Sequence, residues 1–310
     1  MAEQAFRLAT WNLQNLGRED NPAGVYEQKL DFLAGVLERI DADVVVVNEV
    51  REPEAFRDLG DRLPGLPERH LADAPTDFRR LHTGILTRLE VQARGQWYEF
   101  PAVVPGRGGE VERAKFRRPV PWLRVRTAGG EFFLVIGVHL KSDRPELESI
   151  PESEPPRRQT VLGQALAVTG RTMESAGLRC LLDEALLRRP DEALALAGDF
   201  NDGPASDGVR LVCGVEAGLA ESAEGQRLAL VSATAGLPAG QEFSYQGWDR
   251  RQQLDHILVS QLLAGRVARA GIENHLLTDG PPRDRGSRPV GYPRSDHAPV
   301  WVDFGPGGAG

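Results

Sequence analysis

The chain has only two cysteines, three lysines and no long apolar run. The two cysteines, Cys180 and Cys213, lack CxxC spacing, so we expect neither a disulfide framework nor a thiolate zinc site. No stretch approaches the roughly 20 apolar residues that span a bilayer. The N-terminus also lacks the basic-then-apolar plan of a signal peptide. The sequence therefore predicts a cytoplasmic protein without a membrane span.

Basic residues are fewer than acidic ones, 37 against 45. All but three of the 37 basic residues are arginines, which we attribute to the coding bias of a GC-rich genome. The formal net charge is −8, whereas proteins that coat nucleic acid usually carry the net positive charge that releases counterions from phosphates. The composition argues against non-specific coating of nucleic acid. We predict no protein partner and a monomer.

What the chain does contain is an alternation of strand-like and helical segments. At 310 residues, with 41% hydrophobic and 26% charged residues, it can bury a sizeable core. Tyr26, Leu30, Leu33, Leu37 and Ile40 fall on one helical face. A valine run then follows Asp43 and suits a strand buried on both faces. Further strands are predicted at Phe6–Trp11, Thr83–Thr87, Trp122–Val125, Phe132–Val138, Ala193–Ala197, Leu254–Val259 and Pro299–Phe304.

The remaining segments predict one domain. One or two helices are expected between Arg157 and Arg189, interrupted near Gly170 or Gly177. Residues 142–156 and 278–294 have the Pro-rich composition of long loops. We find no internal repeat and no linker, so we predict a single α/β domain over residues 1–304 and a flexible Gly-rich tail at 305–310.

Polar residues lie at the carboxyl ends of almost all the predicted strands, where an α/β sheet usually places its site. Strand ends carry Trp11-Asn12, Asn48-Glu49, His139 with Lys141, and Asp199 with Asn201, whereas Asp255-His256 lies at a strand start and Ser295-Asp296-His297 precedes the last strand. Hydrolysis of a phosphodiester requires a poised water, a counter-charge for the phosphoryl oxygens and stabilisation of the leaving alkoxide. Glu49 is the best candidate to hold Mg²⁺ or Mn²⁺, with Ca²⁺ as an alternative, because hard cations prefer oxygen ligands.

Two pairs could carry the chemistry. Asp255 is a plausible partner for His297, because a carboxylate behind an imidazole fixes its tautomer and stabilises its cation. Asp199 and Asn201 would point to the same side, where the carboxylate positions or deprotonates water and the amide donates to a phosphate oxygen. A turn-forming Asp-x-Asn is the alternative for this pair. Whether Asp199 or His297 takes the proton stays open.

In this order, the motifs resemble the endonuclease/exonuclease/phosphatase superfamily, the deoxyribonuclease-I-like enzymes, over residues 6–304. The resemblance implies a four-layer α/β/β/α sandwich of two mixed β-sheets flanked by helices. It implies that Asn12 and Asp296 complete or support the metal shell of Glu49, and that His139 is a second active-site histidine. It also implies phosphate contacts from Lys141 and from Arg117 or Arg118. His256 is expected to be structural.

Basic clusters flank these motifs. One lies between Arg107 and Arg126, and the other comprises Arg283, Arg285, Arg288 and Arg294. Either cluster could guide a polyanion, and a solvated loop is the alternative for both.

Some features depart from the family pattern. Gln14 stands where some nucleases carry a second carboxylate, which puts a second metal in doubt. Residues 253–257 lack the Trp-Cys-Asp-Arg signature of inositol polyphosphate 5-phosphatases, which disfavours a phosphoinositide substrate. We expect a divalent-metal-dependent phosphodiesterase acting on nucleic acid as an endonuclease or exonuclease. The alternatives are a small-molecule or lipid phosphodiesterase or phosphatase and, less favoured, a non-catalytic binding module.

Overall fold

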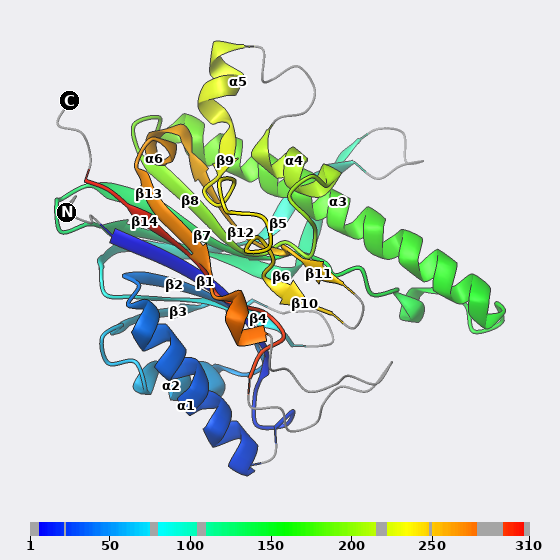
Figure 1. Cartoon of the computed structure of the whole chain (residues 1–310). Helices are drawn as coiled ribbons and strands as arrows, with labels where there is room; N and C mark the ends of the chain where they lie inside the picture. The colour runs from blue at the N-terminus through cyan, green and yellow to red at the C-terminus, as the bar shows by residue number, and fades with distance from the viewer. Residues whose placement is uncertain are drawn as a thin grey trace.

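Two six-stranded sheets stack face to face in this computed structural model of the chain, and helices cover their outer faces (Figure 1). The structure describes residues 6–21, 23–74, 80–103, 110–214, 222–247, 250–277 and 294–306. This architecture confirms the predicted four-layer α/β/β/α sandwich. Arg107, the cluster residues Arg283, Arg285 and Arg288, and tail residues 307–310 lie outside the described residues.

The first sheet is built around a parallel pair that a helix connects. Its order is β13 (Val267–Ile272), β14 (Val300–Phe304), β1 (Phe6–Leu16), β2 (Val44–Val50), β4 (His82–Thr87) and β3 (Glu68–Leu71). Strands β1 and β2 run parallel, whereas their other neighbours are antiparallel. Helix α1 (Ala23–Ile40) crosses from one to the other, and α2 (Pro53–Asp61) follows β2. A crossover of this kind brings the carboxyl ends of both strands to one edge.

The second sheet repeats this plan. Its order is β5 (Glu90–Val103), β6 (Val111–Arg126), β7 (Phe132–His139), β8 (Ala193–Asp199), β12 (Asp255–Ser260) and β9 (Leu230–Ser232). Strands β7 and β8 run parallel and are joined through α3 (Pro156–Arg188). Short elements complete the chain: η1 (Leu147–Ser149), α4 (Asp207–Cys213), α5 (Ala223–Leu228), the hairpin β10 (Tyr245–Gln246) and β11 (Arg251–Gln252), α6 (Gln261–Ala264) and η3 (Asn274–Leu277).

Three apolar layers hold the sandwich together. Phe6, Phe133 and Phe304 stack between the two sheets, where they are almost fully buried. The predicted apolar face of α1 packs on the outer side of the first sheet, and α3 covers the second sheet. The valines of β2 alternate between the inner layer and the layer under α1, which explains why the whole run is apolar.

Two details differ from the sequence-based expectations. Helix α3 is continuous over 33 residues, so the predicted interruption near Gly170 or Gly177 is wrong. Gly177 instead allows close packing, because a Cβ there would lie 2.0 Å from Cδ2 of Phe100. The sequence analysis also missed β5, although its first residues alternate between exposed polar and half-buried positions, the pattern of a half-buried strand.

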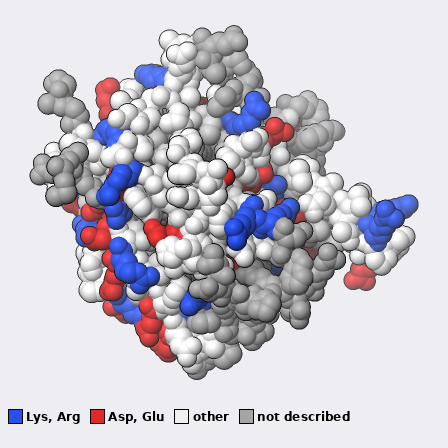
Figure 2. Space-filling view, in the orientation of Figure 1, with Lys and Arg blue, Asp and Glu red and all other residues white. Residues whose placement is uncertain are grey.

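Basic and acidic side chains are interspersed on the face shown in Figure 2, rather than gathered into one broad basic band among the residues described there. None of the described helices combines the length and the apolar character needed to cross a membrane.

Candidate active site

The polar residues at the strand ends meet because the strands are in register. Asn12 of β1 lies opposite Asn48 of β2 in the first sheet. In the second sheet, Asp199 of β8 lies between His139 of β7 and Asp255 of β12. The two parallel pairs therefore bring polar side chains to the same end of the sandwich, as the sequence analysis expected.

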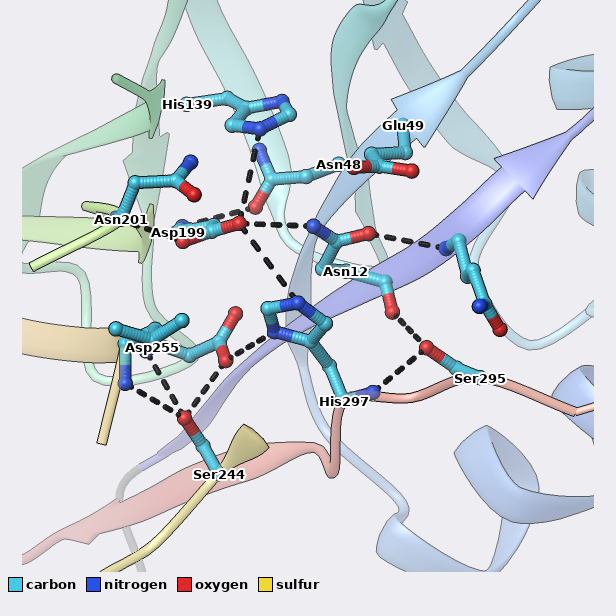
Figure 3. A network of polar contacts seen from close by, with 12 residues as sticks. Asn12, Asn48, Glu49, His139, Asp199, Asn201, Ser244, Asp255, Ser295 and His297 are labelled. Carbon is cyan, nitrogen blue, oxygen red and sulfur yellow. Dashed lines mark hydrogen bonds and ion pairs between the residues drawn. The ribbon is translucent and has the colours of Figure 1, made fainter. Parts of the chain in front are cut away.

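Hydrogen bonds between the sheets join these residues into one network (Figure 3). Nδ2 of Asn12 donates to Oδ2 of Asp199 at 2.8 Å. Asn48 spans the same gap, since its Nδ2 donates to the carbonyl of Val138 and its Oδ1 accepts from the N–H of Asp199. These residues are buried, so the first sheet fixes the Asp199 carboxylate through Asn12 and the Asp199 backbone through Asn48.

A glycine makes this close approach feasible. Gly198 has φ of 147°, and a Cβ at this position would lie 1.9 Å from the carbonyl oxygen of Val138. Only glycine adopts such a conformation without a steric penalty. The residue before Asp199 is therefore dictated by the geometry of the site.

His297 lies between Asp255 and Asp199. Its Nδ1 lies 2.7 Å from Oδ2 of Asp255, and its Nε2 faces Oδ2 of Asp199 at 4.0 Å. The hydroxyl of Ser244 donates to the same Asp255 oxygen at 2.7 Å. Trp11 donates to the backbone carbonyl of His297, and the Tyr245 ring lies against the imidazole. The predicted Asp255–His297 pair is present and braced on several sides.

The two ionisable groups facing each other have shifted pKa values. Burial raises the pKa of Asp199 to about 7, and the charge of Asp255 adds to this effect. Burial opposes the charged form of His297, but the adjacent Asp255 more than compensates and raises its pKa to about 10. His297 is therefore a cation at neutral pH, while Asp199 is poised near neutrality.

Glu49 stands on the first-sheet side of the site. It is half-buried, and its Oε2 accepts the backbone N–H of Asn15 at 2.9 Å. The backbone is left-handed at Glu49, Gln14 and Asn15, with φ between 52° and 60°. Such conformations are costly for residues other than glycine and cluster at functional sites. The chain here is shaped to place side chains rather than to continue a regular strand.

The donor atoms suit a divalent cation. One ligand atom from each of Asp199, Asp255 and His297 lies within 4.8 Å of the other two, but His297 is protonated at neutral pH and leaves the two carboxylates as the donors of this group. Oδ1 of Asp255 is buried without a hydrogen-bond partner. Asn12, Glu49 and Asp296 add carboxylate and amide oxygens, the ligands that hard cations prefer. The site can therefore hold a divalent cation.

The predicted phosphate ligands are tied to the protein. Nζ of Lys141 donates to the carbonyls of Ser142 and Arg144, both at 2.8 Å. Arg118 is buried and donates to the carbonyl of Leu140. Arg117 pairs with Glu146. Their contact with a substrate phosphate stays a prediction.

Asn201, His139 and His256 each contact a neighbouring group at or near the site. The amide of Asn201 donates to the carbonyl of Leu140, and its backbone N–H donates to Oδ1 of Asp199. His139 has its Nε2 3.6 Å from Oδ2 of Asp199. His256 is fully buried, with its Nε2 2.9 Å from the carbonyl of Asp202 and its ring against Phe200, which fits the structural role expected for it.

The sequence analysis missed several residues that support the site. Ser244 braces Asp255, and Asn48 bridges the two sheets. Glu174 of α3 accepts the backbone N–H groups of Arg117 and Lys141. Asn48 had been named with Glu49 as a polar residue at a strand end, but no role had been assigned to it. Ser244 and Glu174 carry no such local signal.

A buried Asp–His pair, a carboxylate hydrogen-bonded across the two sheets and further oxygen donors at one edge of a four-layer sandwich define a phosphoester hydrolase. The sequence profile of the Endonuclease/Exonuclease/phosphatase family matches residues 9–297. The chain belongs to this family. No curated protein matches the sequence significantly.

Solved structures share the fold at low identity. The mannosyl-6-phosphatase Bt3783 of Bacteroides thetaiotaomicron is 19% identical with a TM-score of 0.62, covering 96% of this chain and 98% of that one. An endonuclease/exonuclease/phosphatase family protein of the same organism is 18% identical with a TM-score of 0.60, covering 98% of each chain. A variant of the 3′ phosphatase NExo from Neisseria, bound to product DNA hairpin, is 15% identical with a TM-score of 0.56, covering 97% of this chain and 99% of that one.

Proposed function

We propose that the protein is a divalent-metal-dependent phosphodiesterase whose substrate is nucleic acid. The observation that carries the proposal is the convergence of Asn12, Asp199, Asp255 and His297 in one buried network at the edge of the sandwich. The structural relative bound to a DNA hairpin supports a nucleic-acid substrate. Asn12, Glu49 and Asp296 would hold Mg²⁺ or Mn²⁺, which supplies charge stabilisation to the phosphoryl oxygens.

The charge states assign roles to the two central groups. His297 is cationic at neutral pH, so it donates from Nε2 to a phosphate oxygen and does not act as the base. Asp199, with a pKa of about 7, is suited to accept a proton from the attacking water. Asn12 and the backbone N–H of Asn201 orient its two oxygens. The question that the sequence left open is answered in favour of Asp199 in this proposal.

The surface favours a compact recognition mode. The described basic residues on the face of Figure 2 are interspersed with acidic ones, and the net charge is −8. A negative net charge provides no long-range attraction for a long polyanion. We therefore propose that short single-stranded or terminal segments of nucleic acid are cut.

Phosphomonoester hydrolysis is the second candidate. Two of the structural relatives are phosphatases, one of a mannosyl 6-phosphate type and one acting at a 3′ position. The same residues could serve either reaction, since both need a positioned water and counter-charge at phosphorus. A non-catalytic module is disfavoured because Glu49, Asp199, Asn201, Asp255 and His297 are all present.

A substrate panel tests the proposal. The purified chain is incubated with labelled DNA and RNA oligonucleotides, 3′-phosphorylated DNA, bis(4-nitrophenyl) phosphate and 4-nitrophenyl phosphate, each with MgCl₂, MnCl₂ or EDTA. We expect cleavage of an internal or terminal phosphodiester that EDTA and His297→Ala abolish. Release of phosphate from monoesters alone would favour the second candidate. Activity that survives His297→Ala would identify a contaminant, and inactivity on every substrate would contradict both candidates.

A further inference from the structure

Lys29 is a buried lysine to which the proposed reaction assigns no role. It lies on α1 and is only 1% exposed. Its Nζ donates to the backbone carbonyl of Gln14 at 2.6 Å. A buried ammonium is costly unless negative charge compensates it, so its presence in an apolar helix face requires an explanation.

The hydrogen bond joins this ammonium to the turn that contacts the proposed cation ligands. The backbone N–H of Gln14 donates to Oδ1 of Asn12 at 2.9 Å. The next N–H in the chain, that of Asn15, donates to Glu49. On the other side, the hydroxyl of Ser295 donates to the carbonyl of Asn12 at 2.6 Å. Lys29 is thus bonded to the short turn that contacts Asn12, Glu49 and the residue next to Asp296.

The charges around Lys29 support the same placement. Burial lowers the pKa of Lys29 to about 8, and the carboxylates of Asp296, Glu49 and Asp20 oppose this shift. The ammonium is consequently charged at pH 7 and interacts with two of the proposed ligands. Gln14, to which it is bonded, stands where some family members carry a second carboxylate.

We propose that Lys29 is a built-in counter-charge for Glu49 and Asp296 that weakens divalent-cation binding and limits the site to one ion. This inference rests on the proposed function. A fixed positive charge raises the free energy of a divalent cation in the same low-dielectric region. It also neutralises part of the carboxylate charge that a second cation would need.

Titration of the full chain with MnCl₂ at pH 7 tests the inference, with calorimetry giving the stoichiometry and dissociation constant. Lys29→Met removes the charge and the donor, whereas Lys29→Gln removes the charge and keeps a donor. Lys29→Arg keeps the charge. Lys115→Met is the matched control, because Lys115 is an exposed lysine of β6. Circular dichroism verifies that each variant is folded, and Lys29→Gln decides the question if Lys29→Met does not fold.

We expect one Mn²⁺ per wild-type chain, and a dissociation constant lower by about tenfold or more in both charge-removing variants. Lys29→Arg and Lys115→Met should bind as wild type does. A purely structural lysine would give the opposite sign, since its loss would loosen Asn12 and Glu49 and weaken binding. Two ions in the wild type, or unchanged or weaker binding in the charge-removing variants, would overturn the inference.

The outcome is separable from that of the proposed function. The expected Mn²⁺ affinities together with no hydrolysis of any phosphoester would sustain the role of Lys29 and contradict the activity. Hydrolysis of a phosphoester with unchanged Mn²⁺ affinities would sustain the activity and contradict the role of Lys29. Absence of Mn²⁺ binding in every variant would overturn both.

Discussion

The two sides of the site differ in how firmly their side chains are held. Asp199, Asp255 and His297 are buried, and each is hydrogen-bonded to another side chain. Glu49 and Asp296 are half-buried, and their charges act on the buried ammonium of Lys29. The first side, here called the rigid side, has fixed atoms that can define the geometry around a phosphorus atom. The second side is partly exposed to solvent, which suits an ion that keeps some of its water ligands.

Loss of His297 should have the largest effect. His297→Asn removes the cation that faces Asp199, and we expect kcat for the best phosphoester to fall about 10²–10³-fold, the effect of losing one donor to a developing negative charge. Excess MnCl₂ should not restore it, because the lost group belongs to the rigid side. The exposed His275 provides the matched control as His275→Asn. Recovery of His297→Asn with added metal would contradict the division between the two sides.

Substitution of Glu49 should behave differently. Glu49→Gln keeps the shape but removes the charge, so we expect the Mn²⁺ concentration for half-maximal activity to rise about 10–100-fold, by the scale of losses seen around metal sites. Higher MnCl₂ should recover part of the activity. Glu54→Gln, on the exposed surface of α2, is the control. A loss that no metal concentration relieves would place Glu49 with the rigid side.

The rigid side should also give a pH signature. The pKa of His297 is raised from 6.5 to about 10 in the folded protein. Its contribution to stability is therefore fully present below about pH 6.5 and is lost as pH rises through about 10. The pKa of Asp199 is also raised, from 3.8 to about 7. Its contribution to the free energy of unfolding is therefore lost as pH rises through about 7, and little of this change remains above pH 8.

Asp255→Asn tests this signature, because it removes the charge that holds His297 protonated. We expect the free energy of unfolding of the wild type, measured by urea denaturation without divalent cations, to fall more between pH 8 and 10 than that of the variant. Lys29 titrates in this window in both proteins, so its effect cancels in the difference. Parallel pH profiles would show that Asp255 does not set the charge of His297.

The smallest effect is expected at Ser295, which connects the two sides. Its hydroxyl donates to the carbonyl of Asn12 and accepts the N–H of His297. Ser295→Ala leaves both buried groups without this partner, so we expect a loss of about 1–3 kcal/mol in the free energy of unfolding. Ser222→Ala is a matched control, because Ser222 caps a short helix with its hydroxyl. A loss no larger than that of the control would show that the two sides are not coupled through Ser295.

Much of the site was accessible to prediction because each residue sits where a strand ends. Asn12, Glu49 and Asp199 lie within or at the end of buried strands, and His297 precedes β14, so their positions in the fold depend on local pattern. Ser244 and Glu174 were not predicted because they contact the site from a loop and a helix. Only the packing of these elements brings them there. The continuity of α3 was likewise hidden, since Gly177 interrupts the pattern but serves the contact with Phe100.

The sequence by itself determined the alternation of strands and helices, the family and most of the polar residues that converge. These properties follow from apolar periodicity and from short motifs read along the chain. Tertiary structure decided which groups are charged, which are buried and which are already bonded, as the contrast between His297 and Lys141 shows. The physical reason is that desolvation and charge–charge interaction depend on distances between residues far apart in the sequence.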